Sequence, residues 1–176
     1  TFLLANNYNL GKSLVEKNLI QEANNIQLKA KKLNCELILP IDVVCGKNIH
    51  DTNPVHRKIN EILPEEMVLD IGDESTQLIK NKIINSKMVL WNGPVGAFEF
   101  KPYDKATNAI ANVIKVNAKT LNINTLAGGG DTLSAIKNIH AEDGFNYISN
   151  AGGAFLEWLE GNESPGVKSL KENNLS

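Results

Sequence analysis

The sequence predicts an α/β protein with a doubly wound, Rossmann-like parallel sheet covered by helices on both faces, which makes three layers. Two observations support this prediction. Apolar residues switch repeatedly between helical spacing and the near-continuous runs that are typical of strands buried on both faces. Glycine-rich segments follow three of the predicted strands, and ligands bind at the carboxyl ends of strands in such sheets.

The first predicted helix begins at Ser13, whose hydroxyl can cap the first turn, and Glu16 follows at the capping-box spacing. Apolar residues then recur at intervals of three and four as far as Asn34, while polar residues fill the other face. The near-continuous apolar run 37–44 predicts a strand that is buried on both faces.

A polar stretch from residue 46 to about residue 64 leads to a short predicted strand at 67–70. Asp73 can start the helix that follows. The run 88–91 predicts another buried strand, and the turn at 92–94 ends it.

The remaining elements continue the alternation of helices and strands. Pro102 suits the first turn of a helix. Three more elements follow it: a strand at 122–127, a helix at 131–139 and a strand at 145–149. A short helix then ends near Gly161, and the polar tail from Lys168 is expected to fray or to dock elsewhere. This alternation favours a parallel sheet.

The composition is that of an ordinary globular domain spanning residues 1–176. Hydrophobic residues make up 42% of the chain, and the formal net charge is −2. This charge, and the lack of a run that interleaves Lys or Arg with aromatic residues, predict no nucleic-acid partner and no membrane partner. No apolar stretch reaches the roughly 18 residues that a membrane-spanning helix needs.

Two cysteines, Cys35 and Cys45, are too few for a disulfide scaffold, so reduced thiols and a cytoplasmic protein are expected. None of the three histidines forms a pair at metal-ligand spacing. The tripeptide at 11–13, Gly-Lys-Ser, resembles the end of a P-loop. That motif also needs a glycine five residues earlier, where Asn6 stands, so we discard it.

The segment 91–99 follows a predicted strand and contains two glycines and a proline. Such a turn holds the backbone rigid and close to whatever lies above the sheet. Glu99 carries a carboxylate that is able to accept hydrogen bonds from a ribose. An ordinary connection between strand and helix is the alternative for this segment alone.

Gly128, Gly129 and Gly130 follow the next strand, and their lack of a Cβ lets a ligand contact the peptide groups directly. Asp131 and Thr132 stand at the start of a helix, where free N–H groups and the helix dipole favour phosphate. Asp131 is also an oxygen ligand suited to Mg²⁺, directly or through water. Capping of the helix by Asp131 is the alternative, and the two roles are compatible.

Gly152 and Gly153 repeat this arrangement after the last predicted strand. Two neighbouring strands then each deliver a glycine-rich helix N-terminus to one edge of the sheet. This pairing is more specific than either loop alone, and it suits a polyphosphate that spans two anion sites.

At these three loops the chain resembles the phosphoglycerate kinase family. The signature-like segments are 89–99, 128–132 and 152–154 with 156–157, and further matches follow the family's order at 1–3, 11–16, 39–44, 69–72 and 165–167. The resemblance covers essentially the whole chain. It implies the C-terminal, nucleotide-binding domain of such an enzyme, incomplete on its N-terminal side.

The resemblance implies a glycolytic transferase that moves a phosphoryl group between 1,3-bisphosphoglycerate and ADP, giving 3-phosphoglycerate and ATP, with Mg²⁺. Carried over by position, the residues take these roles: Leu69 and Pro94 flank the adenine, Glu99 holds the ribose, Asn92 faces the phosphates, Gly128, Gly129, Gly130, Asp131 and Thr132 form the phosphate and Mg²⁺ end, and Gly152 and Gly153 open the helix that receives the transferring phosphoryl group.

The family's N-terminal lobe, which binds the phosphoglycerate and carries a catalytic arginine, has no counterpart in the sequence. The same holds for the first strand–helix section of the nucleotide lobe, with its phosphate-binding lysines. We therefore expect no full catalysis by this chain alone, and a monomer for the complete protein. The third glycine loop also departs from the family pattern, because Ala151 stands where a glycine is usual, which is expected to affect rate or phosphate geometry.

Three hypotheses are open at this stage. The chain is part of an active phosphoglycerate kinase, or it is a catalytically inactive nucleotide-binding module, or it is an α/β domain with coincidental glycine loops. A coding continuation before Thr1 would favour the first over the second. Failure to bind any Mg-nucleotide would favour the third.

Overall fold

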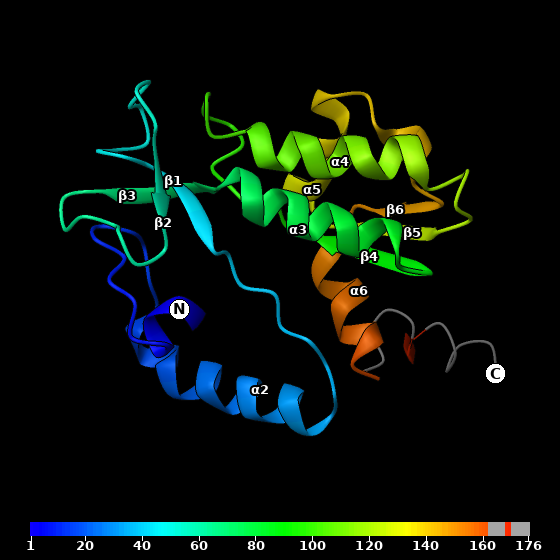
Figure 1. Cartoon of the computed structure of the whole chain (residues 1–176). Helices are drawn as coiled ribbons and strands as arrows, with labels where there is room; N and C mark the ends of the chain where they lie inside the picture. The colour runs from blue at the N-terminus through cyan, green and yellow to red at the C-terminus, as the bar shows by residue number, and fades with distance from the viewer. Residues whose placement is uncertain (162–167, 170–176) are drawn as a thin grey trace. The chain divides into compact units, whose positions relative to one another are not determined.

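The computed structural model describes residues 1–161 and 168–169 (Figure 1). The chain divides into two compact units. Unit 1 contains residues 1–83 and 95–110, and unit 2 contains residues 84–94 and the chain from Ala111 onward. Each unit has a three-stranded sheet of its own. The predicted turn at 165–167 and most of the predicted tail lie outside the described residues.

Sheet A, in unit 1, is antiparallel, with β1 (Asp42–Gly46) between β2 (Val55–Lys58) and β3 (Met67–Ile71). The expectation that the strands near 37–44 and 67–70 join a parallel sheet is therefore wrong. Parallel neighbours need a crossover of a dozen or more residues, usually a helix. The described residues 47–66 contain β2 and no helix, so the chain returns beside β1 in the opposite direction.

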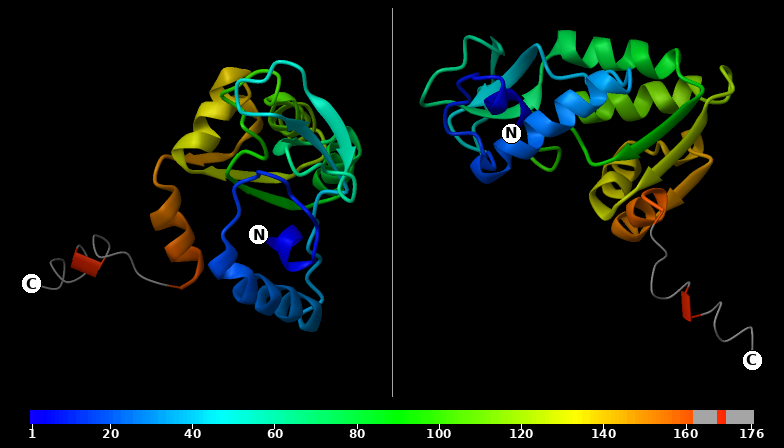
Figure 2. Two further views of the ribbon diagram at one scale, coloured as in Figure 1. Left: turned by 90° about the vertical axis from the view of Figure 1, so that its left-hand side faces the viewer. Right: turned by 90° about the horizontal axis from the view of Figure 1, so that it is seen from below.

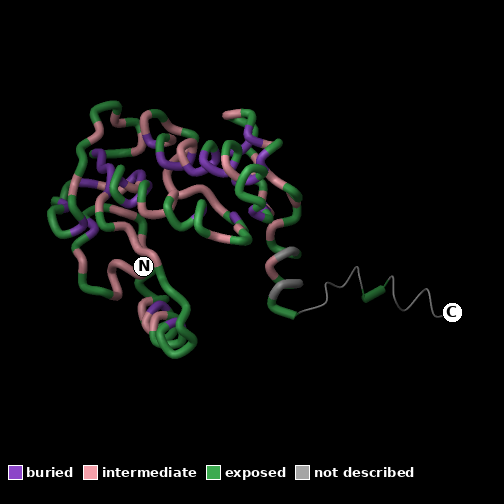
Figure 3. Tube along the Cα trace, turned by 45° about the vertical axis from the view of Figure 1, so that its right-hand side comes forward, coloured by how far each residue is buried: buried purple, intermediate pink, exposed green. Residues whose placement is uncertain are grey.

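The N-terminal part of unit 1 contains α1 (Phe2–Ala5), a 3₁₀ turn (Lys17–Leu19) and α2 (Ile20–Lys32). The prediction that Ser13 caps a helix is wrong. Its hydroxyl donates to the Leu10 carbonyl oxygen and accepts a hydrogen bond from the Val68 amide of β3 at 2.8 Å. Only two residues of α2, Ala23 and Ala30, are buried, and the helix is largely exposed in Figure 3.

The core of unit 1 covers both faces of β1. Val43 and Cys45 belong to a cluster with Leu10, Ile59 and Ile62, whereas Val44 belongs to a second cluster with Leu69 and Tyr103. Successive side chains of a strand point to opposite faces. The predicted burial of this strand on both faces is therefore confirmed for residues 43–45.

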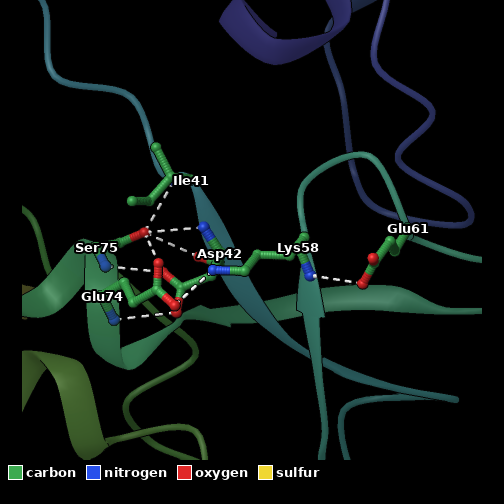
Figure 4. Close-up of polar contacts among 6 residues, drawn as sticks. All are labelled: Ile41, Asp42, Lys58, Glu61, Glu74 and Ser75. Atoms are coloured by element: carbon green, nitrogen blue, oxygen red, sulfur yellow. Dashed lines mark hydrogen bonds and ion pairs between the residues drawn. The ribbon is translucent and has the colours of Figure 1, made fainter.

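Helix α3 (Asp73–Ile84) begins where the sequence predicts, but its first turn is held by a residue from another element (Figure 4). The Asp42 carboxylate, on β1, accepts hydrogen bonds from the amides of Ser75 at 2.7 Å and Glu74 at 3.0 Å. Burial acts to raise the pKa of Asp42, but the hydrogen bonds from Ser75 and Glu74 outweigh it, so the pKa lies below its usual value. These bonds join sheet A to α3.

Sheet B, in unit 2, is the predicted parallel sheet, with strands in the order β4 (Met88–Asn92), β5 (Asn124–Gly128) and β6 (Tyr147–Ser149). Its strands alternate with helices. α4 (Lys105–Asn117), which belongs to unit 2 from Ala111 onward, precedes β5, and α5 (Gly130–Asn138) follows it. A 3₁₀ turn (Glu142–Gly144) then leads to β6, and α6 (Gly152–Leu159) follows β6. Figures 1 and 2 show α5 and α6 on opposite sides of sheet B.

Side-chain hydrogen bonds hold the amino end of sheet B, whereas part of β4 is exposed. The Thr125 hydroxyl donates to the Gly144 carbonyl oxygen at 2.7 Å, and the Thr125 amide donates to the Asn146 side-chain oxygen at 2.7 Å. In contrast, Met88 and Leu90 of β4 are exposed, so the prediction of a buried strand holds for the face of Trp91 and not for theirs.

Within the described residues, no helix is both long and apolar enough to cross a membrane.

Candidate functional site

The carboxyl ends of the three strands of sheet B lie side by side. The register pairs Asn92 with Gly128 and Gly128 with Ser149, and the Gly129 amide donates to the Ser149 carbonyl oxygen at 3.2 Å. The turn after β4 and the glycine loops after β5 and β6 therefore leave the sheet at the same edge, as the sequence predicts.

Gly129 and Gly152 bring the two glycine loops into direct backbone contact. A Cβ on Gly152 would lie 2.7 Å from the Gly129 Cα, closer than side chains approach backbone atoms in real proteins. Gly129 also has a φ of 98°, which side chains strongly disfavour. The Asn92 side-chain oxygen lies 3.1 Å from the Cβ position of Gly129 and 3.3 Å from that of Gly152. The structure thus brings these three predicted site residues together.

Gly130 and Gly153 differ from Gly129 and Gly152 in their packing. They lie in the first turns of α5 and α6, and a Cβ on either would meet no atom of the described residues within 4 Å. Neither has a positive φ, so neither packing nor backbone conformation requires glycine at these positions. Their effect is to leave the peptide groups of two helix N-termini accessible from outside, and such N–H groups favour anions.

The side chain of Thr132 is occupied within the protein. It is 1% exposed, and its hydroxyl accepts a hydrogen bond from the Gly93 amide at 2.6 Å. The carbonyl oxygen of Gly93 in turn accepts from the Trp91 indole at 2.7 Å. The turn that carries Asn92 and Pro94 is therefore held by bonds to both peptide groups of Gly93. The hydroxyl of Thr132 therefore holds this turn in place and is not exposed to solvent at this edge.

Asp131 is exposed in the first turn of α5. In the described part of the chain, no group of three or more His, Cys, Asp or Glu side chains could hold a metal ion. Mg²⁺ usually binds through one or two carboxylates together with phosphate oxygens and water. A single accessible carboxylate beside two helix N-termini therefore fits Mg²⁺ that is held jointly with a bound phosphate.

Leu69 and Glu99, the predicted base and ribose contacts, belong to unit 1. Leu69 is 7% exposed and lines a cavity of about 400 Å³ together with Val95 and Ala97. The Ala97 amide donates to the Leu69 carbonyl oxygen at 2.8 Å, which joins this segment to β3, and Glu99 is exposed two residues later. No role could be predicted for Val95 and Ala97, because an apolar loop residue carries no signal of which cavity it lines.

Asp70, on β3, is a further residue of unit 1 for which no role was predicted from the sequence. It is 2% exposed, and it accepts hydrogen bonds from the Ile71 amide at 2.9 Å and the Ala106 amide at 3.1 Å. Burial raises the pKa of Asp70 to about 6, and the nearby carboxylates of Asp104 and Asp73 act in the same direction. A carboxylate within a buried strand was the available signal.

A parallel sheet flanked by helices, with glycine loops at its carboxyl edge, places the chain among the Rossmann-like α/β proteins. A family model described as phosphoglycerate kinase matches residues 1–162. The chain therefore belongs to the phosphoglycerate kinase family.

Relatives and solved structures agree with this assignment. The phosphoglycerate kinases of Rhodospirillum centenum and Granulibacter bethesdensis are each 42% identical to the chain over 172 residues, covering 97% of the chain and 43% of the relative. The structure of the phosphoglycerate kinase from Coxiella burnetii matches with a TM-score of 0.86 at 33% identity, over 92% of this chain and 41% of that one. The enzyme from Pyrococcus horikoshii, at 22% identity over 97% of this chain and 42% of that one, shares the fold with a TM-score of 0.76. The chain thus spans less than half the length of the relatives it matches.

Proposed function

We propose that this chain is the nucleotide-binding part of a phosphoglycerate kinase, which transfers a phosphoryl group between 1,3-bisphosphoglycerate and ADP and gives 3-phosphoglycerate and ATP. The observation that carries the proposal is the accessible backbone at Gly130 and Gly153, in the first turns of two neighbouring helices. Helix N-termini of this kind suit the phosphates of ADP and ATP. The family membership supports the same ligand.

In unit 2, the residues divide the work of holding the phosphates. The exposed amides of Gly130 and Asp131 bind phosphate oxygens, and Thr132 supports them through its bond to the Gly93 amide. Gly152 and Gly153 receive the transferring phosphoryl group at the start of α6. Phosphoryl transfer depends chiefly on positioning and on stabilisation of charge. Mg²⁺, held by Asp131, supplies part of that stabilisation when it is bound, and Asn92 orients the phosphates from the end of β4.

In unit 1, Leu69 and the apolar walls of its cavity bind the base, and Glu99 accepts hydrogen bonds from the ribose hydroxyls. The family likeness assigns Pro94, in unit 2, to the base as well. 1,3-Bisphosphoglycerate and 3-phosphoglycerate bind to parts of the whole enzyme that this chain does not contain. We place the complete protein in the cytoplasm, as a monomer.

A nucleotide-binding module without kinase activity is the second candidate. None of the segments 91–99, 127–132 and 149–154 contains a Lys or an Arg. Phosphoryl-transfer enzymes place such cations on the transferring group. On this observation, the chain alone binds Mg-ADP without catalysing turnover, and a kinase assay with 1,3-bisphosphoglycerate separates the two candidates.

Calorimetric titration with Mg-ADP tests the proposal. We expect saturable binding that Asp131→Ala weakens roughly tenfold, as for the loss of one contact to a charged group. Asp143→Ala is the matched control, because it removes an exposed carboxylate from the same unit at the amino end of β6. Equal weakening by both variants, or no binding by a folded chain, would contradict the proposed site.

A further inference from the structure

Two carboxylates, Glu66 and Asp70, are buried within the described residues, and their surroundings differ. Glu66 forms an ion pair with Arg57 at 2.7 Å. Asp70 has no ion pair among the described residues, and the hydrogen bonds that it accepts come from two backbone amides. A buried carboxylate without a cationic partner is costly to ionise. The presence of a carboxylate at position 70, in the core of unit 1, therefore requires an explanation.

The contacts of Asp70 lie at the two ends of the segment 96–106. At one end, the Gly96 backbone packs so closely on the carboxylate that a Cβ there would lie 2.3 Å from Oδ1. At the other end, the Ala106 amide, in the first turn of α4, donates to Oδ2 at 3.1 Å. Glu99 lies between these two ends, and Leu69 directly precedes Asp70 on β3.

We propose that Asp70 is a positioning residue for nucleotide binding: its carboxylate holds both ends of the segment 96–106 against β3, and so fixes Glu99 and the apolar wall beside Leu69. The inference rests on the nucleotide-binding function proposed above and adds a residue to it. Asp70 acts through the segment that it anchors.

Several titratable groups of neighbouring elements lie around Asp70. Asp73 of α3, Lys105 of α4 and His56 of β2 line a cavity of about 190 Å³ together with Asp70, and Asp104 lies just before α4. Because burial raises the pKa of Asp70 to about 6, its charge changes within an accessible pH range. A carboxylate accepts stronger hydrogen bonds than a neutral carboxyl group. The anchor therefore weakens as the pH falls through about 6.

Affinity for Mg-ADP, measured by calorimetry from pH 5 to pH 8 at constant ionic strength, tests this proposal. We expect the unsubstituted chain to lose roughly fivefold more affinity between pH 7.5 and pH 5 than Asp70→Asn does. The Asn side chain of this variant is uncharged at every pH, so the affinity profile of the variant contains only the titration of the ligand and of the other groups. Asp73→Asn, the matched control, keeps the extra loss with a slightly lower midpoint, because Asp73 helps to raise the pKa of Asp70.

A second measurement separates the anchor from the nucleotide. In the ligand-free, unsubstituted chain, the NMR shift of the Ala106 amide is expected to show an inflection near pH 6, because this amide donates to Asp70. This NMR measurement needs no variant, so it tests the inference even if Asp70→Asn does not fold. Parallel affinity profiles for the chain and Asp70→Asn, or a flat Ala106 shift, overturn the inference alone. An inflection at Ala106 without Mg-ADP binding at any pH overturns the nucleotide-binding function, and this inference with it.

Discussion

At the scale of single residues, the Thr132 hydroxyl and the Gly93 amide form a hydrogen bond across 39 positions of sequence. Thr132→Val keeps the shape of the side chain but removes the acceptor, leaving the Gly93 amide without its partner. We expect a loss of about 1–3 kcal/mol in the free energy of unfolding and weaker binding of Mg-ADP. Urea denaturation and calorimetry check both effects. Thr132→Ser keeps the hydroxyl and should retain most of the affinity; equal defects in Ser and Val variants would contradict this role.

Some of these residues were visible in the sequence and others were not. Asp131 and the glycines around it stand out because consecutive glycines before a helix have few other uses. The hydrogen-bond partners of Asp70 and of the Thr132 side chain could not be predicted, because they lie 36 and 39 positions away in the sequence. Sequence spacing predicts local bonds, whereas bonds of this kind exist only once the chain has folded.

At the scale of elements, the glycines at the N-termini of α5 and α6 differ in their packing. Gly152 packs closely against the Gly129 backbone, whereas the Cβ positions of Gly130 and Gly153 have no close neighbour among the described residues. Gly152→Ala places a methyl group against the Gly129 backbone, so we expect it to destabilise unit 2 by about 1–3 kcal/mol. The added methyl group of Gly153→Ala meets no atom of the described residues within 4 Å, and Ala favours the helix more than Gly does. We therefore expect this variant to keep or raise the free energy of unfolding, by up to about 1 kcal/mol. We expect Gly153→Ala to weaken Mg-ADP binding nonetheless, since the methyl group covers backbone that the ligand uses.

Denaturation and calorimetry on the same two variants measure these effects. The pair serves as its own control, because the substitutions are chemically identical and stand at adjacent positions. Unaltered Mg-ADP binding by Gly153→Ala would argue against ligand contact at the start of α6. Unaltered stability in Gly152→Ala would argue against the close packing of the two loops.

Element prediction succeeded where local pattern and tertiary contacts agree. β5 and α5 occur close to the predicted positions, because three consecutive glycines mark the end of the strand and the start of the helix. β2 was missed, because Val-His-Arg-Lys is a mostly exposed edge strand with no alternating pattern. The first predicted helix begins instead at Ile20, because the Ser13 hydroxyl is engaged with Leu10 and Val68. Contact with a distant strand overrode a local capping signal.

At the scale of the whole molecule, the family could be predicted and the arrangement of the strands could not. Several motifs occur in the family's order, and such an order is readable without coordinates. The division of the strands between an antiparallel and a parallel sheet depends on which strands pair across long stretches of chain. Alternating helices and strands therefore predicted the α/β class and sheet B, but not the separate sheet A.

The different burial of the two cysteines gives this chain a built-in reporter of unfolding. Cys35 is exposed, whereas Cys45 lies in the core of sheet A. Burial raises the pKa of the Cys45 thiol to about 11, and only the thiolate reacts readily with a disulfide reagent. At pH 8, Cys35→Ser should therefore react only as fast as unit 1 opens. Rapid labelling of that variant under native conditions would contradict the packing. Slow labelling would give the opening free energy of unit 1 without any denaturant.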